Sequence, residues 1–185
     1  MSTPRVSHLD LTGNPLVFID KVTMGAISDL TGLEELSLSR CELESLPEGL
    51  LRRQRRLKRL DLSDNKFKTL PAVLQESLSL VYLNFDRNSL TTLDSETSPI
   101  KIPNLQELSI SGQSHLQNIT KSALGGMQNL AILRLSHNTR LTYIDPYFLM
   151  SEVEDGEEWP SIRELYLKNN NISTIDSRML ESWES

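Results

Sequence analysis

Large apolar residues recur along the chain in units of 23 to 32 residues. Within each unit they follow the pattern L-x-x-L-x-L-x-x-N/C-x-L, whose ninth position is usually asparagine. Chance does not place seven such matches nearly in phase, so the pattern predicts a repeat architecture. The units begin at Val6, Leu33, Leu57, Leu80, Leu105, Leu130 and Ile162.

The first part of each unit predicts a short β-strand. In the third unit, Leu60, Asp61 and Leu62 alternate between apolar and polar, which is the period of a strand with one buried face. Leu60 and Leu62 are expected to point into the core, and Asp61 to point outward. Because every unit contributes one such strand in the same direction, the strands are expected to form a parallel sheet with neighbours about 4.7 Å apart.

The asparagine that follows each strand is expected to form a buried ladder. A buried amide needs hydrogen-bond partners, and stacked asparagines can bridge the turns of adjacent repeats. Cys41 and Gln113 occupy the equivalent position in two units and are expected to break the ladder. The predicted ladder residues are Asn14, Asn65, Asn88, Asn138 and Asn170.

The back half of each unit carries a second apolar signature, such as Ile119 with Ala123 and Leu124. Leu46-Pro47 and Leu70-Pro71 occupy this place in two units, where proline favours extended or short 3₁₀ segments. The predicted fold is therefore an α/β solenoid of about seven repeats. It is expected to curve, with the parallel sheet on the concave face and short irregular, 3₁₀ or helical segments on the convex face.

The array is predicted to be one domain over residues 1–185 and part of a longer array. End repeats bury only one side of their ladder, so Leu9, Leu11, Ile172 and Trp183 are expected near half-covered edges. Self-association through an end is the alternative to a longer array.

Unit length near 24 and the form LxxLxLxxNxLxxLPxxLL resemble the typical subclass of leucine-rich repeats. The run SHNTRLTYIDPYFL is similar to units in invertebrate ectodomains. That subclass is found largely in animal cell-surface and secreted proteins, such as Toll-like receptor, Slit and chaoptin ectodomains. The resemblance implies a binding scaffold outside the cell or at its surface. The chain departs from the family's secreted members in lacking Cys-rich caps, and its sixth unit is long.

Composition narrows the classes of partner and chemistry. The net charge of −6 argues against nucleic acid, and no apolar stretch reaches transmembrane length. The start MSTPRVSH shows no signal peptide. Cys41 has no second cysteine to pair with, and the three histidines fall in different repeats. No nucleophile motif, phosphate loop or metal spacing is present, so we expect no enzyme, no cofactor and no metal.

Three further surface features of the sequence are candidates for a function. The basic run from 52 to 59 is interpreted as a solvated segment rather than a nuclear localisation signal or polyanion site. The acidic residues from 152 to 158 are expected to form an exposed loop, with docking of a basic partner as the alternative. The sequons at Asn118 and Asn171 are candidate glycosylation sites.

The sequence thus predicts a protein-recognition module of a receptor or adhesion ectodomain that binds through its concave face. An intracellular scaffold or regulatory subunit is the alternative, favoured by the single cysteine. Binding hot spots are enriched in Tyr, Trp and Arg. Strand phase places the following candidate contacts on the concave side: Tyr82, Asn84, Asp86, Arg87, Ile132, Arg134, His137, Tyr166 and Lys168. Outward positions in the second, third and fifth units are mostly small or charged: Glu35, Ser37, Arg59, Asp61, Ser109 and Ser111.

Overall fold

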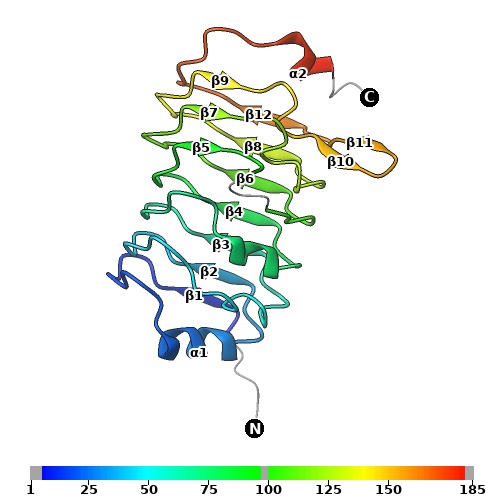
Figure 1. The fold of residues 1–185 in the computed structure, drawn as a ribbon. Coiled ribbons are helices and arrows are strands. Elements are labelled where there is room, and N and C mark those ends of the chain that lie inside the picture. The colour runs from blue at the N-terminus through cyan, green and yellow to red at the C-terminus, as the bar shows by residue number, and fades with distance from the viewer. Residues whose placement is uncertain (1–5, 97–99, 182–185) are drawn as a thin grey trace.

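The computed structural model describes residues 6–96 and 100–181, which wind into a solenoid with one long parallel sheet (Figure 1). In the described part of the chain this sheet has seven strands, and every strand runs parallel to its neighbours. The predicted fold class is confirmed, with one strand from every repeat. In spatial order the strands are β1 (His8–Asp10), β2 (Glu35–Ser37), β3 (Arg59–Asp61), β4 (Tyr82–Asn84), β6 (Glu107–Ser109), β8 (Ile132–Arg134) and β12 (Glu164–Tyr166).

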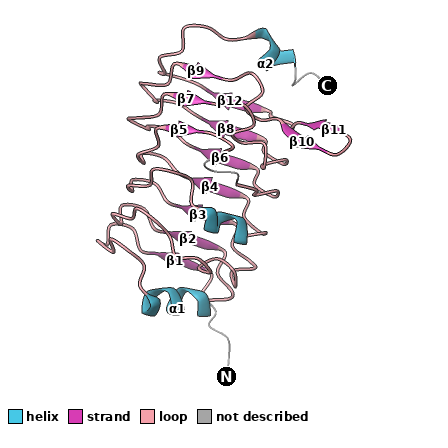
Figure 2. Ribbon diagram, viewed as in Figure 1, coloured by secondary structure: helices cyan, strands magenta, loops and turns pink. Residues whose placement is uncertain are grey.

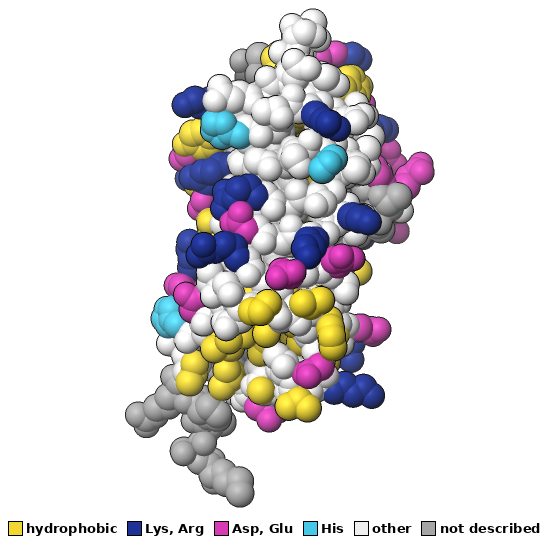
Figure 3. Space-filling model, turned by 90° about the vertical axis from the view of Figure 1, so that its left-hand side faces the viewer, with side chains coloured by type: hydrophobic (Ala, Val, Ile, Leu, Met, Phe, Trp, Pro, Cys, Tyr) yellow, Lys and Arg dark blue, Asp and Glu magenta, His cyan; other side chains and the backbone are white. Residues whose placement is uncertain are grey.

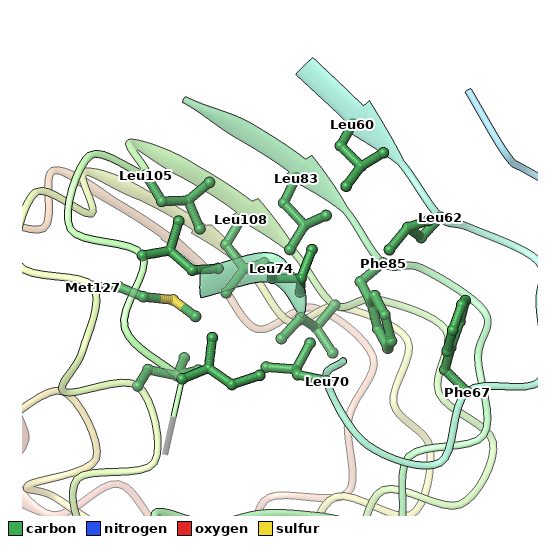
Figure 4. Packing of buried hydrophobic residues seen from close by; sticks show 14 of the residues in the cluster. Leu60, Leu62, Phe67, Leu70, Leu74, Leu83, Phe85, Leu105, Leu108 and Met127 are labelled. Atoms are coloured by element: carbon green, nitrogen blue, oxygen red, sulfur yellow. The ribbon is translucent and has the colours of Figure 1, made fainter. Parts of the chain in front are cut away.

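A leucine at the centre of each strand sets the register. Leu60 pairs with Leu83, and Leu83 pairs with Leu108, so these side chains stack on the same inner face. Figure 4 shows them pointing into one interior, where the rings of Phe67 and Phe85 lie 5.4 Å apart between centroids. All five side chains are almost completely buried, so the core runs along the array as a rod.

The turn after each strand is a tight one in every repeat. The residue before the ladder position has a left-handed backbone each time, which turns the chain out of the sheet. Asn65 lies fully inside this turn: its Oδ1 accepts from the N–H groups of Cys41 and Leu43 at 3.1 and 2.9 Å. The left-handed residues are Gly13, Arg40, Asp64, Arg87, Gly112, His137 and Asn169.

Our expectation that Gln113 breaks the ladder is wrong, and Cys41 interrupts the ladder only in part. The Gln113 Oε1 accepts from the Leu90 N–H at 3.2 Å, and its Nε2 donates to the Phe85 carbonyl at 2.8 Å. The longer amide therefore bonds to the same turn backbones as an asparagine. The Cys41 thiol replaces the asparagine of the ladder only in part. It donates to the Leu11 carbonyl at 3.2 Å, but it has no amide oxygen. Burial raises the pKa of this thiol above its usual value.

The side of the array opposite the sheet is built from short segments, as Figure 2 shows. The 3₁₀ helix η1 (Ala72–Glu76) begins directly after Pro71, as the proline predicted. Two α-helices lie at the ends, α1 (Lys21–Asp29) and α2 (Ser177–Glu181). In three later repeats, this side differs from the irregular or helical segments that we expected. Their backbones pair into a second parallel sheet, which consists of β5 (Thr92–Leu93), β7 (Asn118–Ile119) and β9 (Tyr143–Ile144).

The acidic insertion is a β-hairpin rather than a loop. Strands β10 (Ser151–Val153) and β11 (Gly156–Glu158) pair antiparallel and project from the side of the array (Figure 1). Lys121 Nζ lies 3.1 Å from Glu152, and Gln128 donates to Glu158 at 2.8 Å. The base of the hairpin is therefore held against the preceding repeat.

The ends of the sheet are half covered. Leu9, Leu11 and Ile172 are partly buried against the core, as predicted, and Trp183 lies outside the described residues. Ile175 is 49% exposed, so the second apolar signature of the last repeat is only partly buried. Within residues 6–96 and 100–181, no helix has the length and hydropathy to cross a bilayer. The extent of the domain beyond this chain stays a prediction.

Candidate binding surface on the sheet

The outward side chains of the seven-stranded sheet form two rows, which we call the sheet face. The pairing of the strands fixes the members of each row. Row one contains His8, Glu35, Arg59, Tyr82, Glu107, Ile132 and Glu164. Row two contains Asp10, Ser37, Asp61, Asn84, Ser109, Arg134 and Tyr166.

The structure brings five of the predicted contact residues onto this face. Tyr82 and Ile132 belong to row one, and Asn84, Arg134 and Tyr166 belong to row two. Each of the five is half-buried or exposed, so the alternation of residues along each strand predicted their outward direction correctly.

The other four predicted residues lie in the turns beyond the strands. Arg87 donates two hydrogen bonds of 2.7 Å to the carboxylate of Asp64, and this guanidinium holds the pKa of Asp64 below its usual value. Asp86 accepts from Ser109 and from the Ser111 N–H at 2.6 and 2.7 Å. His137 and Lys168 are exposed. Arg87 and Asp86 are thus engaged within the chain at the rim of the sheet face.

An acid, a guanidinium and an aromatic ring line up across the first strands, and we call Glu35, Arg59 and Tyr82 the first Glu–Arg–Tyr cluster. Arg59 Nε lies 4.0 Å from Glu35 Oε1, and its guanidinium carbon lies 3.9 Å from the centroid of the Tyr82 ring. A cation over an aromatic face is attracted by the ring quadrupole. Burial, followed by the charge of Glu107, raises the pKa of Tyr82.

The same chemistry recurs on the last strands, where Glu107, Arg134 and Tyr166 form the second Glu–Arg–Tyr cluster. Arg134 donates to Glu107, and its guanidinium carbon lies 5.2 Å from the Tyr166 ring centroid. The Tyr166 hydroxyl donates to Glu164 at 2.5 Å, and this hydrogen bond is the main cause of the raised pKa of Tyr166. The Tyr166 side chain is nevertheless 44% exposed, so much of its surface remains open.

Sequence reasoning missed Arg59 and Glu107 as members of these clusters. Arg59 is predicted only as one of the small or charged outward residues, and Glu107 is not among the predicted contacts. The signal that could have found them is register, because Arg59 stands directly opposite Tyr82, and Tyr82 directly opposite Glu107. A shallow groove of roughly 520 Å³ lies beside the first cluster and includes Asp10 and Asp61 in its lining.

A line of hydroxyl groups beside the sheet was also missed. The Oγ atoms of Ser39 and Ser63 lie 3.0 Å apart, and the Ser111 Oγ accepts from the Ser136 N–H at 3.1 Å. The recurring L-x-L-S sequence was the available signal. Ser39 and Ser63 are buried and Ser111 is half-buried, and these hydroxyl groups link the turns of consecutive repeats.

The remaining candidates lie outside the two Glu–Arg–Tyr clusters. Asn171 is exposed in the last repeat, and Asn118 is half-buried in β7 between β5 and β9. His8 lies 3.5 Å from Glu35, whereas His115 is exposed in a turn. In the part of the chain that the structure describes, no group of three or more His, Cys, Asp and Glu side chains is arranged to hold a metal ion.

Comparisons with known proteins agree with this architecture. Transforming growth factor beta activator LRRC33 of Danio rerio is 30% identical over 183 residues, which is 95% of this chain and 26% of that protein. The chain thus spans about a quarter of the length of this relative. Human 5T4, also called trophoblast glycoprotein, matches 97% of the chain and 66% of its own with a TM-score of 0.70 and 20% identity. The TLR13–ssRNA13 complex matches 97% of the chain and 27% of its own with a TM-score of 0.66 and 23% identity.

Family models agree with these likenesses. A model described as Leucine rich repeat matches residues 4–67, 31–90 and 103–151, and a second model of the same description matches 161–183. Together these segments cover most of the 185 residues. The chain is a member of the leucine-rich repeat family.

Proposed function

We propose that the sheet face binds a protein ligand, and that the chain is part of a receptor or adhesion ectodomain. The observation that carries the proposal is the pair of Glu–Arg–Tyr clusters on one rigid sheet. Tyrosine and arginine are among the residues most enriched at binding hot spots. A sheet that presents both types twice, on strands locked by paired backbones, offers fixed contacts to a partner.

The clusters are already ordered before any partner arrives. Each arginine lies between a glutamate on one neighbouring strand and a tyrosine ring on the other, so its long side chain is restrained. Association normally costs about 0.5–1.5 kcal/mol for each flexible side chain that is immobilised, and a restrained side chain avoids much of that cost. Both clusters are therefore suited to be the anchors of an interface.

The spacing of the two clusters sets the size of the partner surface. Glu35 and Glu107 belong to strands that are three positions apart in the sheet, which corresponds to about 14 Å. One helix or strand of a protein partner can span that distance and contact both clusters. Tyr82, Arg134 and Tyr166 are the residues we assign as main contacts, with Arg59 and Glu107 orienting them.

An extracellular setting is part of the proposal. It is supported by the resemblance of the units to those of cell-surface and secreted proteins, and by the relative named as a transforming growth factor beta activator. We propose Asn171 as the preferred glycosylation site, because its side chain is exposed whereas Asn118 is half-buried within a sheet. A scaffold inside the cell is the alternative, and the single buried thiol of Cys41 favours it.

A protein partner fits the charge of this chain better than a nucleic acid does. The TLR13–ssRNA13 complex is 23% identical to the chain, so that likeness concerns the fold alone. The net charge of −6 opposes a polyanion, because nucleic-acid affinity depends on neutralising phosphates with lysine and arginine. Arg59 and Arg134 on the sheet face are each already paired with a glutamate.

Photo-cross-linking tests the proposal before a ligand is known. Benzoylphenylalanine would replace Tyr166 on the sheet face or, as a matched control, Tyr143 on β9, which is exposed to a similar degree at 49%. Each protein would be irradiated on intact cells and in secreted-protein extracts. We expect a protease-sensitive covalent adduct from position 166 and none from position 143. Adducts from position 143 alone, or adducts removed by ribonuclease, would contradict the proposal.

A further inference from the structure

A cleft opens on the side of the array opposite the sheet, between the segments that the second and third repeats place there. We call it the Glu76 cleft, and its volume is roughly 610 Å³. The first repeat lies on one side of these two repeats and the fourth on the other. Additional repeats at an end of the array would therefore leave the Glu76 cleft open.

The cleft exists because the two segments do not pair with each other. In the fourth, fifth and sixth repeats, the equivalent segments are β5, β7 and β9, and their backbones are joined by hydrogen bonds. The segments of the second and third repeats contain Pro47 and Pro71 instead, and proline has no N–H to donate. These two segments are not paired as strands in the part of the chain that the structure describes. The space between them is left to side chains.

Side chains give the cleft an apolar floor and an acidic rim. Leu46, Phe67 and Val73 line the floor, and the last two belong to the buried core. The rim carries Glu44 and Glu48, and Glu76 is the third carboxylate of the lining. Neither lysine nor arginine is present among the described residues that line it.

This single sign of charge is unusual for the surface of the array. On the side that Figure 3 shows, acidic and basic side chains are interspersed over the middle repeats. Such mixed surfaces attract neither sign strongly, whereas a hollow lined by one sign of charge concentrates ions of the opposite sign. The lining of the cleft therefore favours a cation that also has apolar surface to place on the floor.

Glu76 is the member of the lining that lacks a hydrogen-bond donor. Its Oε1 accepts from the Gly49 N–H at 2.9 Å, whereas its buried Oε2 has no partner among the described residues. A buried oxygen without a donor is costly, so a ligand that donates to this carboxylate would be stabilised there. Arg52 Nη2 lies 3.3 Å from Glu76 and 3.4 Å from Glu48, which shows that these two glutamates accept a cation between them. The Arg52 side chain is 65% exposed, so it can give way to a ligand.

We propose that the Glu76 cleft binds an aliphatic ammonium ion, with the charged group among the three glutamates and the hydrocarbon stem on the apolar floor. An ammonium group has three donors and no acceptor, so it suits a site built of carboxylate oxygens. A small movement of the Glu76 side chain turns its Oε2 towards the ligand. Either a free amine or the lysine side chain of a protein partner has this chemistry, and two probes distinguish these sources.

Titration of the full chain with n-hexylammonium, followed by the amide resonances in NMR spectra, tests the proposal. We expect a dissociation constant of roughly 1–10 mM and the largest shift at the Gly49 amide, which donates to Glu76. Ethylammonium has the same charge on a shorter stem and should bind at least about fivefold more weakly. Hexanol has the stem without the charge and should also bind about fivefold more weakly or less. Tighter binding of acetyl-Leu-Lys-Leu-amide than of hexylammonium would assign the site to a partner's lysine, and the reverse order to a free amine.

Three variants separate this site from general attraction to an acidic protein. Glu76→Gln keeps an acceptor for the Gly49 N–H and should weaken hexylammonium binding about fivefold, the effect of one unit charge at 4 Å in water. Glu48→Gln should weaken it as well without unfolding the chain, because the Glu48 side chain is 89% exposed. Glu154→Gln makes the same change on the acidic hairpin and should leave the affinity unchanged.

Several results would overturn the proposal. One is the absence of a saturable shift at Gly49 up to about 50 mM hexylammonium. Another is equal affinity for hexylammonium and hexanol, which would show that the carboxylates contribute nothing. Unchanged affinity in both cleft variants, or an equal loss in Glu154→Gln, would place the cation elsewhere on the chain.

Discussion

Replacing Asn65 with leucine is expected to lower the free energy of unfolding by about 3 kcal/mol or more, because several buried backbone groups lose their partner at roughly 1–3 kcal/mol each. The Asn65 side chain accepts from two N–H groups and donates to three carbonyl oxygens. Those backbone groups lie in the buried turns of two adjacent repeats. Leucine has the same branched shape and is somewhat larger, but it has no hydrogen-bonding atom, so it leaves them unsatisfied.

Urea-induced unfolding would measure the effect of Asn65→Leu. Asn171→Leu is the matched control, since it makes the same chemical change at an exposed side chain in another repeat. Asp61→Ala, on the sheet face, is a second control that removes one hydrogen bond to the Ser63 N–H. We expect both controls to shift stability by about 1 kcal/mol or less. Equal losses for all three variants would show that the ladder contributes nothing special to stability.

Replacing Gly125 with alanine is expected to destabilise the chain by about 3 kcal/mol, the upper end of the usual cost of overpacking. A Cβ at this position would lie 2.2 Å from the Met150 carbonyl oxygen and 3.0 Å from its carbon. Both atoms belong to the backbone of the following repeat, so no side chain can rotate away. The two chain segments must therefore separate to accommodate one methyl group.

Gly25→Ala provides a control of opposite sign. Gly25 lies inside α1, and a Cβ there meets nothing within 4 Å among the described residues. Alanine is the better helix former by roughly 0.5–1 kcal/mol, so the variant should be more stable than the wild type. Thermal unfolding of both variants would compare them. A stabilised Gly125→Ala variant would mean that the two segments are farther apart than described.

The parallel sheet could be predicted from sequence because its cause is local and repeated. Every unit places leucines at the same strand positions, and the pairing of Leu60 with Leu83 and of Leu83 with Leu108 follows directly from that phase. Gln113 was misjudged because residue type alone does not reveal the reach of its side chain. Its extra methylene lets the amide contact the Phe85 carbonyl from a turn that carries one more residue.

The acidic hairpin and α1 were missed although local signals existed for both. Asp155-Gly156 is a common turn dipeptide, but it was interpreted only as part of a charged stretch. Asp20 accepts from the Thr23 N–H at 2.7 Å, which is an N-terminal helix cap that the sequence displays. The short helix itself was hidden because Val22, Thr23 and Gly25 are all weak helix formers.

The candidate contact residues could be placed by phase, but their mutual contacts could not. Phase puts Tyr82 and Arg134 on the outward face, and the structure agrees. The side-chain conformation of Arg59 or Arg134 depends on a glutamate on one neighbouring strand and a tyrosine on the other. The rotamers of residues on three strands are therefore coupled, and the sequence alone does not give them. The Glu–Arg–Tyr clusters therefore became visible only in three dimensions.

The affinity of a captured partner for a sheet-face variant tests the central claim most directly. The triple variant Tyr82→Ala, Arg134→Ala and Tyr166→Ala should bind at least about 100-fold more weakly than the wild type, since a hot-spot residue contributes about 2 kcal/mol or more. The double variant Tyr143→Ala and Arg140→Ala, which alters exposed residues away from the sheet face, should bind as the wild type does. Unchanged affinity in a correctly folded triple variant would contradict the account and place the binding surface elsewhere on the array.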